Sequence, residues 1–228
     1  RTLQFQFAHV DEKGMLLNKI LGVRSAAPQL GYRLSIVAAQ GAKPYATTRR
    51  DQPFIATPIP SISADGQSVI AIQSQELPGG LSSSGAITLT SAGLRGDTLW
   101  SKRLTYKPNI ITDAHVRQMI DSFAKPIIAR GAMRLAGDRK MIADSLIRPP
   151  TWPAVTALLT GLDGTIWLKP GAPTTGADSY WWRLSPTGVF ETLVRVPSGL
   201  NLMQASRNRL WGWRPDENDV PVIERYRY

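Results

Sequence analysis

The feature that most constrains this chain is a short turn-and-strand unit that recurs along it. Residues 162–167 (LDGTIW) align with residues 206–211 (SRNRLW), and the two tryptophans stand 44 residues apart. Residues 64–70 (ADGQSVI) form a third copy without the tryptophan. In each copy a polar turn precedes a strand, and in the first two copies the strand carries a tryptophan whose large side chain suits the wedge between two sheets. A period of about 40–45 residues with four strands per period is typical of propeller blades.

Strand patterns occupy most of the chain. Apolar and polar residues alternate at 3–7, the turn residues 11–14 (DEKG) follow, and residues 15–20 are predicted to be the return strand. Such alternation is typical of strands with one buried face. Residues 53–62 are predicted to be extended. Further strands are predicted at residues 32–37, 68–72, 86–90, 98–104, 155–159, 166–169, 180–184, 189–196, 200–205, 210–213 and 222–228.

One helical insertion interrupts this pattern. Thr112 or Asp113 is suited to cap a helix, and Pro126 is expected to end or kink it. A second helix is predicted at residues 138–146, with Met141, Ile142 and Leu146 facing inward, before a rigid proline-rich segment at 148–153. Apolar residues recur at helical spacing in the first helix, at Val116, Met119, Ile120, Phe123 and Ile127.

The expected fold is mainly β: an incomplete, open propeller-like array of antiparallel sheets with a short helical insertion. The expected parts are N-terminal blades at 1–111, the insertion and connector at 112–150, and C-terminal blades at 151–228. A β-sandwich whose turns are similar by coincidence is the alternative fold.

The turns of the C-terminal part also carry a family resemblance. Its residues are 163–167 (DGTIW), 185–188 (SPTG), 207–214 (RNRLWGWR), 216–217 (DE) and 222–226 (VIERY). The segment 152–228 resembles the closing blades of a bacterial six-bladed β-propeller family that is mostly envelope-associated. The polar helix before Trp152 also resembles that family's insertion, and the first half of the chain matches only loosely. These motifs are structural and imply no catalytic residues.

Length sets a limit on that resemblance. Six blades need about 260 residues before any insertion. This chain has 228 residues, and without its insertion it has room for about four blades. The expected count is a half blade, two fuller blades and a half blade. Such an open array leaves sheet edges and apolar faces for partners to cover.

Candidates for chemistry are few. The chain has no cysteine, which excludes disulfides, thiolate metal sites and a cysteine nucleophile. Its two histidines are His9, near Asp11 and Glu12, and His115, in the first turn of the predicted helix. Residues 82–84 (SSS) lack the pattern of an exposed nucleophile, and the acidic residues at 216–219 fit a hairpin turn better than a calcium loop. We therefore expect no catalytic residue, no cofactor and no metal.

Charge is the more informative signal. There are 27 basic against 17 acidic residues, for a net charge of +10, and 19 of the basic residues are arginine. Arginine suits polar docking surfaces because its forked donors match carboxylate and phosphate. A generally soluble basic surface is the alternative interpretation. The residues expected to dock a partner are Arg130, Arg134, Arg139, Lys140, Arg207, Arg209, Arg214, Arg225 and Arg227.

Nucleic acid is not the expected partner, because no recognition helix, zinc finger or stacking motif appears. Five tryptophans lie in predicted strands, where core packing explains them better than base stacking. They are Trp167, Trp181, Trp182, Trp211 and Trp213. Membrane protein subunits are the expected partners, with anionic lipid headgroups as a further contact. No run of about 18 apolar residues is present, so no transmembrane helix is expected.

The expected function is a non-catalytic extrinsic subunit that docks on the periplasmic side of a membrane assembly and stabilises it. The chain is similar to the β-rich accessory subunit of a photosynthetic reaction-centre–light-harvesting complex, and its start at Arg1 is expected of a processed, exported protein. The alternative is a ligand-binding or hydrolytic propeller, whose central-channel site would hold several carboxylates.

Overall fold

The computed structural model describes residues 4–24, 33–40, 43–55, 59–76, 84–129, 136–172 and 178–228. Two helices, α1 (Asp113–Ala129) and α2 (Ala136–Ser145), lie between β8 and β9 in the chain. The strands are β1 (Gln4–Val10), β2 (Leu16–Arg24), β3 (Arg33–Gln40), β4 (Lys43–Asp51), β5 (Pro60–Ile62), β6 (Ser68–Glu76), β7 (Gly85–Gly93), β8 (Thr98–Tyr106), β9 (Val155–Thr160), β10 (Ile166–Pro170), β11 (Ser179–Leu184), β12 (Phe190–Val196), β13 (Asn201–Ser206), β14 (Arg209–Pro215) and β15 (Pro221–Arg227).

Every sheet is an antiparallel meander in which neighbouring strands follow one another along the chain. The sheets are β1–β2, β3–β4, β5–β8, β9–β12 and β13–β15. The two sheets in the middle of the chain have four strands each, whereas the last has three. The mainly β prediction, with antiparallel sheets and a helical insertion, is confirmed.

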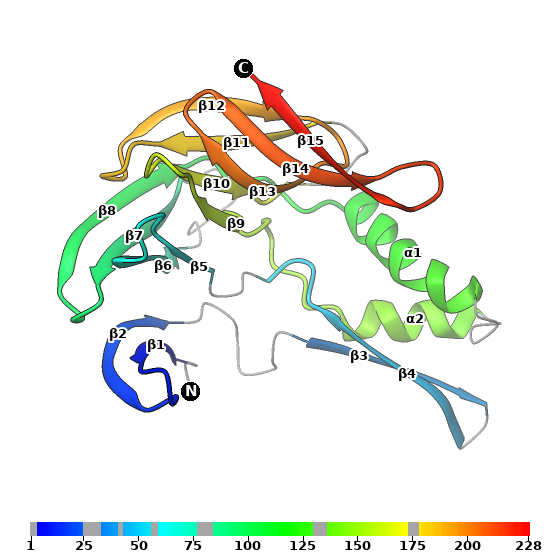
Figure 1. Ribbon diagram of the computed structural model, residues 1–228. Coiled ribbons are helices and arrows are strands. Elements are labelled where there is room, and N and C mark those ends of the chain that lie inside the picture. Colours follow the sequence, from blue (N-terminus) through cyan, green and yellow to red (C-terminus); the bar gives the residue numbers. More distant parts are fainter. Residues whose placement is uncertain are drawn as a thin grey trace.

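Four of these sheets pack face to face in chain order (Figure 1). Ile20 and Leu21 of β2 pack against the β5–β8 sheet. The core between β5–β8 and β9–β12 contains Ile70, Ile72, Ile87, Leu89, Ile166, Leu168 and Leu184. The core between β9–β12 and β13–β15 contains Trp167, Trp181, Val194, Ala205 and Leu210.

The two-sided packing explains why β6 and β10 read as continuous apolar runs. Along a strand, successive side chains point to opposite faces. Ile166 and Leu168 therefore face the β5–β8 sheet, while Trp167 between them faces β13–β15, and all three are fully buried. A strand covered on both faces needs no polar side.

The same type of hairpin turn recurs at successive sheets. In the β9–β10 turn the N–H of Gly164 donates to the carbonyl of Gly161 at 3.0 Å, and the N–H of Gly161 donates to the carbonyl of Thr165 at 2.7 Å. The β11–β12 turn repeats this pattern, with Gly188 in the role of Gly164. Both glycines have positive φ, 78° and 77°, as the last residue of this turn requires.

The helical insertion has its own core. The Thr112 hydroxyl accepts the N–H of His115 at 3.3 Å, and the His115 Nδ1 accepts the N–H of Thr112 at 3.2 Å, so the predicted cap is confirmed. Gln52 closes the end of α2, because its side chain donates to the Ser145 carbonyl and accepts the N–H of Ile147, both at 3.1 Å. The core contains Phe54, Val116, Ala124, Ile142, Leu146 and Trp152, with Met119, Ile120 and Phe123 packed against it.

The structure differs from the sequence-based expectations at two places, because α1 does not end at Pro126 and β4 is an additional strand. α1 continues through Pro126 to Ala129, because a proline in the last turn removes a single helix hydrogen bond and leaves little helix beyond it to disrupt. β4 (Lys43–Asp51, KPYATTRRD) was not predicted, because its sequence lacks the alternation of a half-buried strand. The predicted inward positions of Ile127 and Met141 lie outside the described part of the structure, which does not include these two side chains.

Candidate functional site

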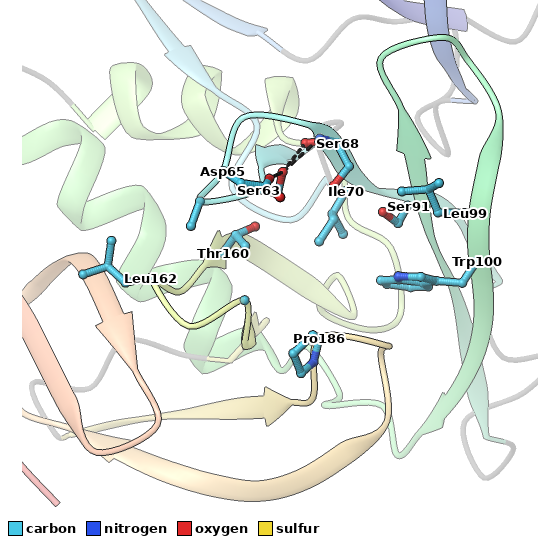
Figure 2. A pocket seen from close by; sticks show the side chains of 12 residues that line it. Ser63, Asp65, Ser68, Ile70, Ser91, Leu99, Trp100, Thr160, Leu162 and Pro186 are labelled. Atoms are coloured by element: carbon cyan, nitrogen blue, oxygen red, sulfur yellow. Dashed lines mark hydrogen bonds between the residues drawn. The ribbon is translucent and has the colours of Figure 1, made fainter.

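A pocket opens between the turns of the two four-stranded sheets (Figure 2). It has a volume of about 520 Å³. Ser63, Ser91 and Thr160 contribute polar groups to its lining, and the Trp100 ring and Pro186 contribute apolar surface. Pockets of this volume are large enough for a small ligand.

Asp65 is the carboxylate residue that lines this pocket, and its turn already uses it. The Ser63 hydroxyl donates to Asp65 Oδ1 at 2.6 Å, and the N–H of Gln67 donates at 3.0 Å. These hydrogen bonds, that of Ser63 first, lower the pKa of Asp65. A carboxyl group with a lowered pKa is a poor general acid at neutral pH. Among the described residues that line the pocket, Asp65 is the single carboxylate, whereas the hydrolytic alternative expects several.

The other candidates for chemistry have local structural roles. His115 caps α1 and lies edge-on to the Trp152 ring, with 5.8 Å between ring centroids. Asp11 accepts the N–H groups of Lys13 and Met15 in the β1–β2 turn.

The acidic segment 216–219 is the predicted hairpin turn, in which Asp216 accepts two backbone N–H groups. Among the described residues no group of three or more His, Asp or Glu side chains could hold a metal ion. Residues 82 and 83 lie outside the described part.

Asp163 joins the β9–β12 and β13–β15 sheets at their turns. Its Oδ2 accepts the N–H of Arg207 at 2.6 Å, and its Oδ1 accepts the Thr165 hydroxyl at 2.6 Å and the Thr165 N–H at 3.2 Å. The same hydroxyl accepts Nε1–H of Trp167 at 2.9 Å. Burial acts to raise the pKa of Asp163, but the hydrogen bonds from Thr165 and Arg207 outweigh it and lower the pKa. The hydrogen bonds of this turn thus keep the carboxylate ionised and link the two sheets.

A second set of polar contacts reinforces this junction. Arg183 donates to the Glu191 carboxylate at 2.9 Å and to the Arg207 carbonyl at 2.6 Å. Arg207 donates to the other oxygen of Glu191 at 3.2 Å. The Arg183 guanidinium lies 6.0 Å from the centroid of the Tyr228 ring. Arg207, a predicted docking residue, is therefore part of the link between the two sheets.

Three more of the predicted docking residues have carboxylate partners within the chain. Arg139 lies 3.2 Å from Asp121. Lys140 lies 2.7 Å from Asp144, and Arg214 lies 2.8 Å from Glu224. Arg130 and Arg134 lie outside the described residues.

Arg209, Arg225 and Arg227 are different, because no carboxylate among the described residues lies within ion-pair distance of them. Strand register gathers them on one face of the β13–β15 sheet. Arg209 stands directly opposite Arg227, and Trp211 stands opposite Arg225. The three arginines therefore share a face with an aromatic residue, and two of them form a like-charge pair, which is unfavourable.

This face, which we call the arginine–tryptophan face, comprises Arg209, Trp211, Trp213, Ile223, Arg225 and Arg227. Ile223 is 76% exposed and Trp213 is 36% exposed. Leu210 and Tyr226, which alternate with these residues, pack on the opposite face against β9–β12. The expectation of core packing is confirmed for Trp167 and Trp181 but is wrong for Trp213. The sequence Leu-Trp-Gly-Trp contains the signal, because its two tryptophans stand two residues apart and so share a face.

No protein family model, no curated protein and no solved structure matches the chain. In the part of the chain that the structure describes, no helix combines the length and apolarity needed to cross a membrane.

Proposed function

We propose that this protein is a non-catalytic extrinsic subunit that docks on a membrane protein assembly and braces it. In this proposal the arginine–tryptophan face is the contact surface. The extracytoplasmic side of the membrane is the proposed location, and the photosynthetic reaction-centre–light-harvesting assembly suggested by the sequence is a proposed example of the partner.

The observation that carries the proposal is the equivalence of Trp167 and Trp211. The two residues occupy the same place in the repeat, and each points to the side where a following sheet would pack. Trp167 is fully buried there by β13–β15. Among the described residues no sheet covers the face that carries Trp211. In this proposal the stack is a propeller-like array, and a partner covers that face.

The chemistry of the face supports a protein as the partner. Tryptophan and arginine are enriched among the residues that dominate the binding energy of protein interfaces. Three arginines without carboxylate partners favour an acidic surface. Ile223 and Trp213 add apolar area that bare lipid headgroups do not match.

Co-sedimentation with native membranes tests the proposal. The variant Arg209→Glu/Arg225→Glu/Arg227→Glu changes the face. The control variant Lys102→Glu/Arg117→Glu/Lys125→Glu changes the net charge equally at exposed residues elsewhere. We expect the first variant to lose membrane association at least about tenfold, and the control to stay within about twofold of wild type. Equal losses in the two variants would show that net charge, and not this face, determines association.

Binding of the same two variants to lipid vesicles is the second part of the test. We expect vesicles that contain only anionic lipid to bind the protein weakly and equally in the two variants. If such vesicles reproduced the full difference between the variants, the partner would be lipid and the proposal of a protein partner would be wrong.

A further inference from the structure

The outer edge of β15 carries the further inference, which rests on the docking function proposed above. β15 pairs with β14 on one side, and no other strand of the described residues pairs with it. The two preceding sheets each have a fourth strand at the corresponding position. An unpaired edge presents backbone N–H and C=O groups that can pair with another chain.

The register identifies which residues present these groups. In an antiparallel pair, hydrogen-bonded and non-hydrogen-bonded positions alternate. Asp216 donates its N–H to the Val220 carbonyl at 2.9 Å, and Tyr228 donates to the Asn208 carbonyl at 3.4 Å. The even-numbered positions of β15 therefore bond to β14, and the odd-numbered positions point outward.

The outward-pointing backbone groups belong to Ile223, Arg225 and Arg227. Pro221, which has no N–H to leave unpaired, falls in the same outward set, where proline is tolerated in an edge strand. The side chains of Ile223, Arg225 and Arg227 lie on the arginine–tryptophan face. An added strand would thus bring its own alternate side chains beside two arginines and an exposed isoleucine.

We propose that an extended acidic segment of the partner adds to β15 as a fourth, antiparallel strand. Its pattern is acidic–x–acidic–x–apolar, which places the acidic residues opposite Arg227 and Arg225 and the apolar residue opposite Ile223. Backbone hydrogen bonds supply affinity in this mode of recognition, and the alternate side chains supply specificity.

The charges on the two faces of β15 explain why the proposed partner segment has acidic residues at alternate positions only. The partner's carboxylates would offset the repulsion between Arg209 and Arg227, which stand directly opposite each other. On the other face, Glu224 already accepts hydrogen bonds from Arg214 and from the Tyr226 hydroxyl. The intervening positions of the partner strand therefore need no charge.

Peptide binding to the full chain, measured by isothermal titration or fluorescence anisotropy, tests this proposal. The probe is the blocked peptide Thr-Glu-Thr-Glu-Thr-Val-Thr. In the proposed register the amides of its second glutamate and its valine point toward β15, whereas those of its third and fifth residues point away. We expect N-methylation of the second glutamate and the valine to weaken binding at least about tenfold. N-methylation of the third and fifth residues should change binding by less than about twofold.

Variants of the protein distinguish the contribution of backbone pairing at the β15 edge from that of the arginine charges. Ile223→Pro removes an outward N–H, keeps the bonds to β14 and leaves the arginines unchanged, so we expect it to abolish peptide binding. Arg225→Glu/Arg227→Glu should weaken binding at least about tenfold, and Arg117→Glu/Lys125→Glu on α1 should not weaken it. Circular dichroism checks that each variant is folded.

Two results would overturn strand addition. One is absence of binding by the acidic peptide. The other is binding that both N-methylated peptides and the Ile223→Pro variant retain, which would indicate a purely ionic contact. The second result leaves the proposed docking function intact, because co-sedimentation with membranes tests that function separately.

Discussion

Asp163 provides the sharpest test of how the sheets are held together. The substitution Asp163→Ala removes the acceptor of three hydrogen bonds. Two come from Thr165, which is 1% exposed, and one comes from the backbone of Arg207 in the next sheet. The Thr165 hydroxyl still accepts Nε1–H of Trp167, but it loses the group to which it donates.

The expected loss of stability follows from these contacts. A buried donor left without a partner costs about 1–3 kcal/mol, and Thr165 contributes two such donors. Water can replace the acceptor of the exposed Arg207 N–H. We therefore expect Asp163→Ala to lower the free energy of unfolding by about 3 kcal/mol.

Asp216→Ala is the matched control. Asp216 also accepts two backbone N–H groups in a hairpin turn, from Asn218 and Val220, but its turn is exposed and the bonds do not reach another sheet. We expect this substitution to lower stability by about 1 kcal/mol or less. Urea unfolding followed by tryptophan fluorescence measures both values.

The pH dependence adds an independent check. The pKa of Asp163 is lowered in the folded protein, so its contribution to stability is present above the unfolded pKa of about 3.9. The contribution is lost as pH falls through the folded pKa. The difference between wild type and Asp163→Ala should therefore shrink below about pH 4. Equal losses for Asp163→Ala and Asp216→Ala at pH 7 would refute this account of the junction.

Three further substitutions have defined outcomes. Gly188→Ala places a methyl group 2.9 Å from the Trp100 ring, whereas Gly199→Ala meets nothing within 4 Å although its φ is also positive; we expect the first to destabilise the protein by about 1–3 kcal/mol more in thermal unfolding. Leu168→Ala removes a fully buried side chain between two sheets and should lower the free energy of unfolding by about 2–5 kcal/mol in urea. Gln52→Ala removes two bonds at the end of α2 and should accelerate hydrogen exchange in α2 more than in β10.

Much of the fold was predictable because strand signals are local. The Asp-Gly and Pro-Thr-Gly sequences predict the hairpin turns, and the apolar runs at 68–72 and 166–169 predict the strands β6 and β10. β4 was missed because Pro44 and its run of polar residues interrupt any alternation. The continuation of α1 past Pro126 was missed because the rule for proline applies most strongly in the middle of a helix.

The candidate site was less predictable, because it depends on register. The basic residues of the C-terminal part were visible in the sequence, but their partners were not. Arg207 and Arg214 have carboxylate partners on other strands, whereas Arg225 and Arg227 do not. The exposure of Trp213 depends on which sheet covers β14, and this is a tertiary property that the alternation of a single strand does not reveal.

Site-specific photocrosslinking in native membranes tests the central claim most directly. A photoreactive residue at position 223, where Ile223 is 76% exposed on the arginine–tryptophan face, is compared with one at position 15 in the β1–β2 turn, where Met15 is 66% exposed. The β1–β2 sheet lies at the other end of the stack (Figure 1). The docking account predicts a discrete crosslink to a membrane protein from position 223 and none from position 15. Equal crosslinking from both positions, or none from position 223, would contradict it.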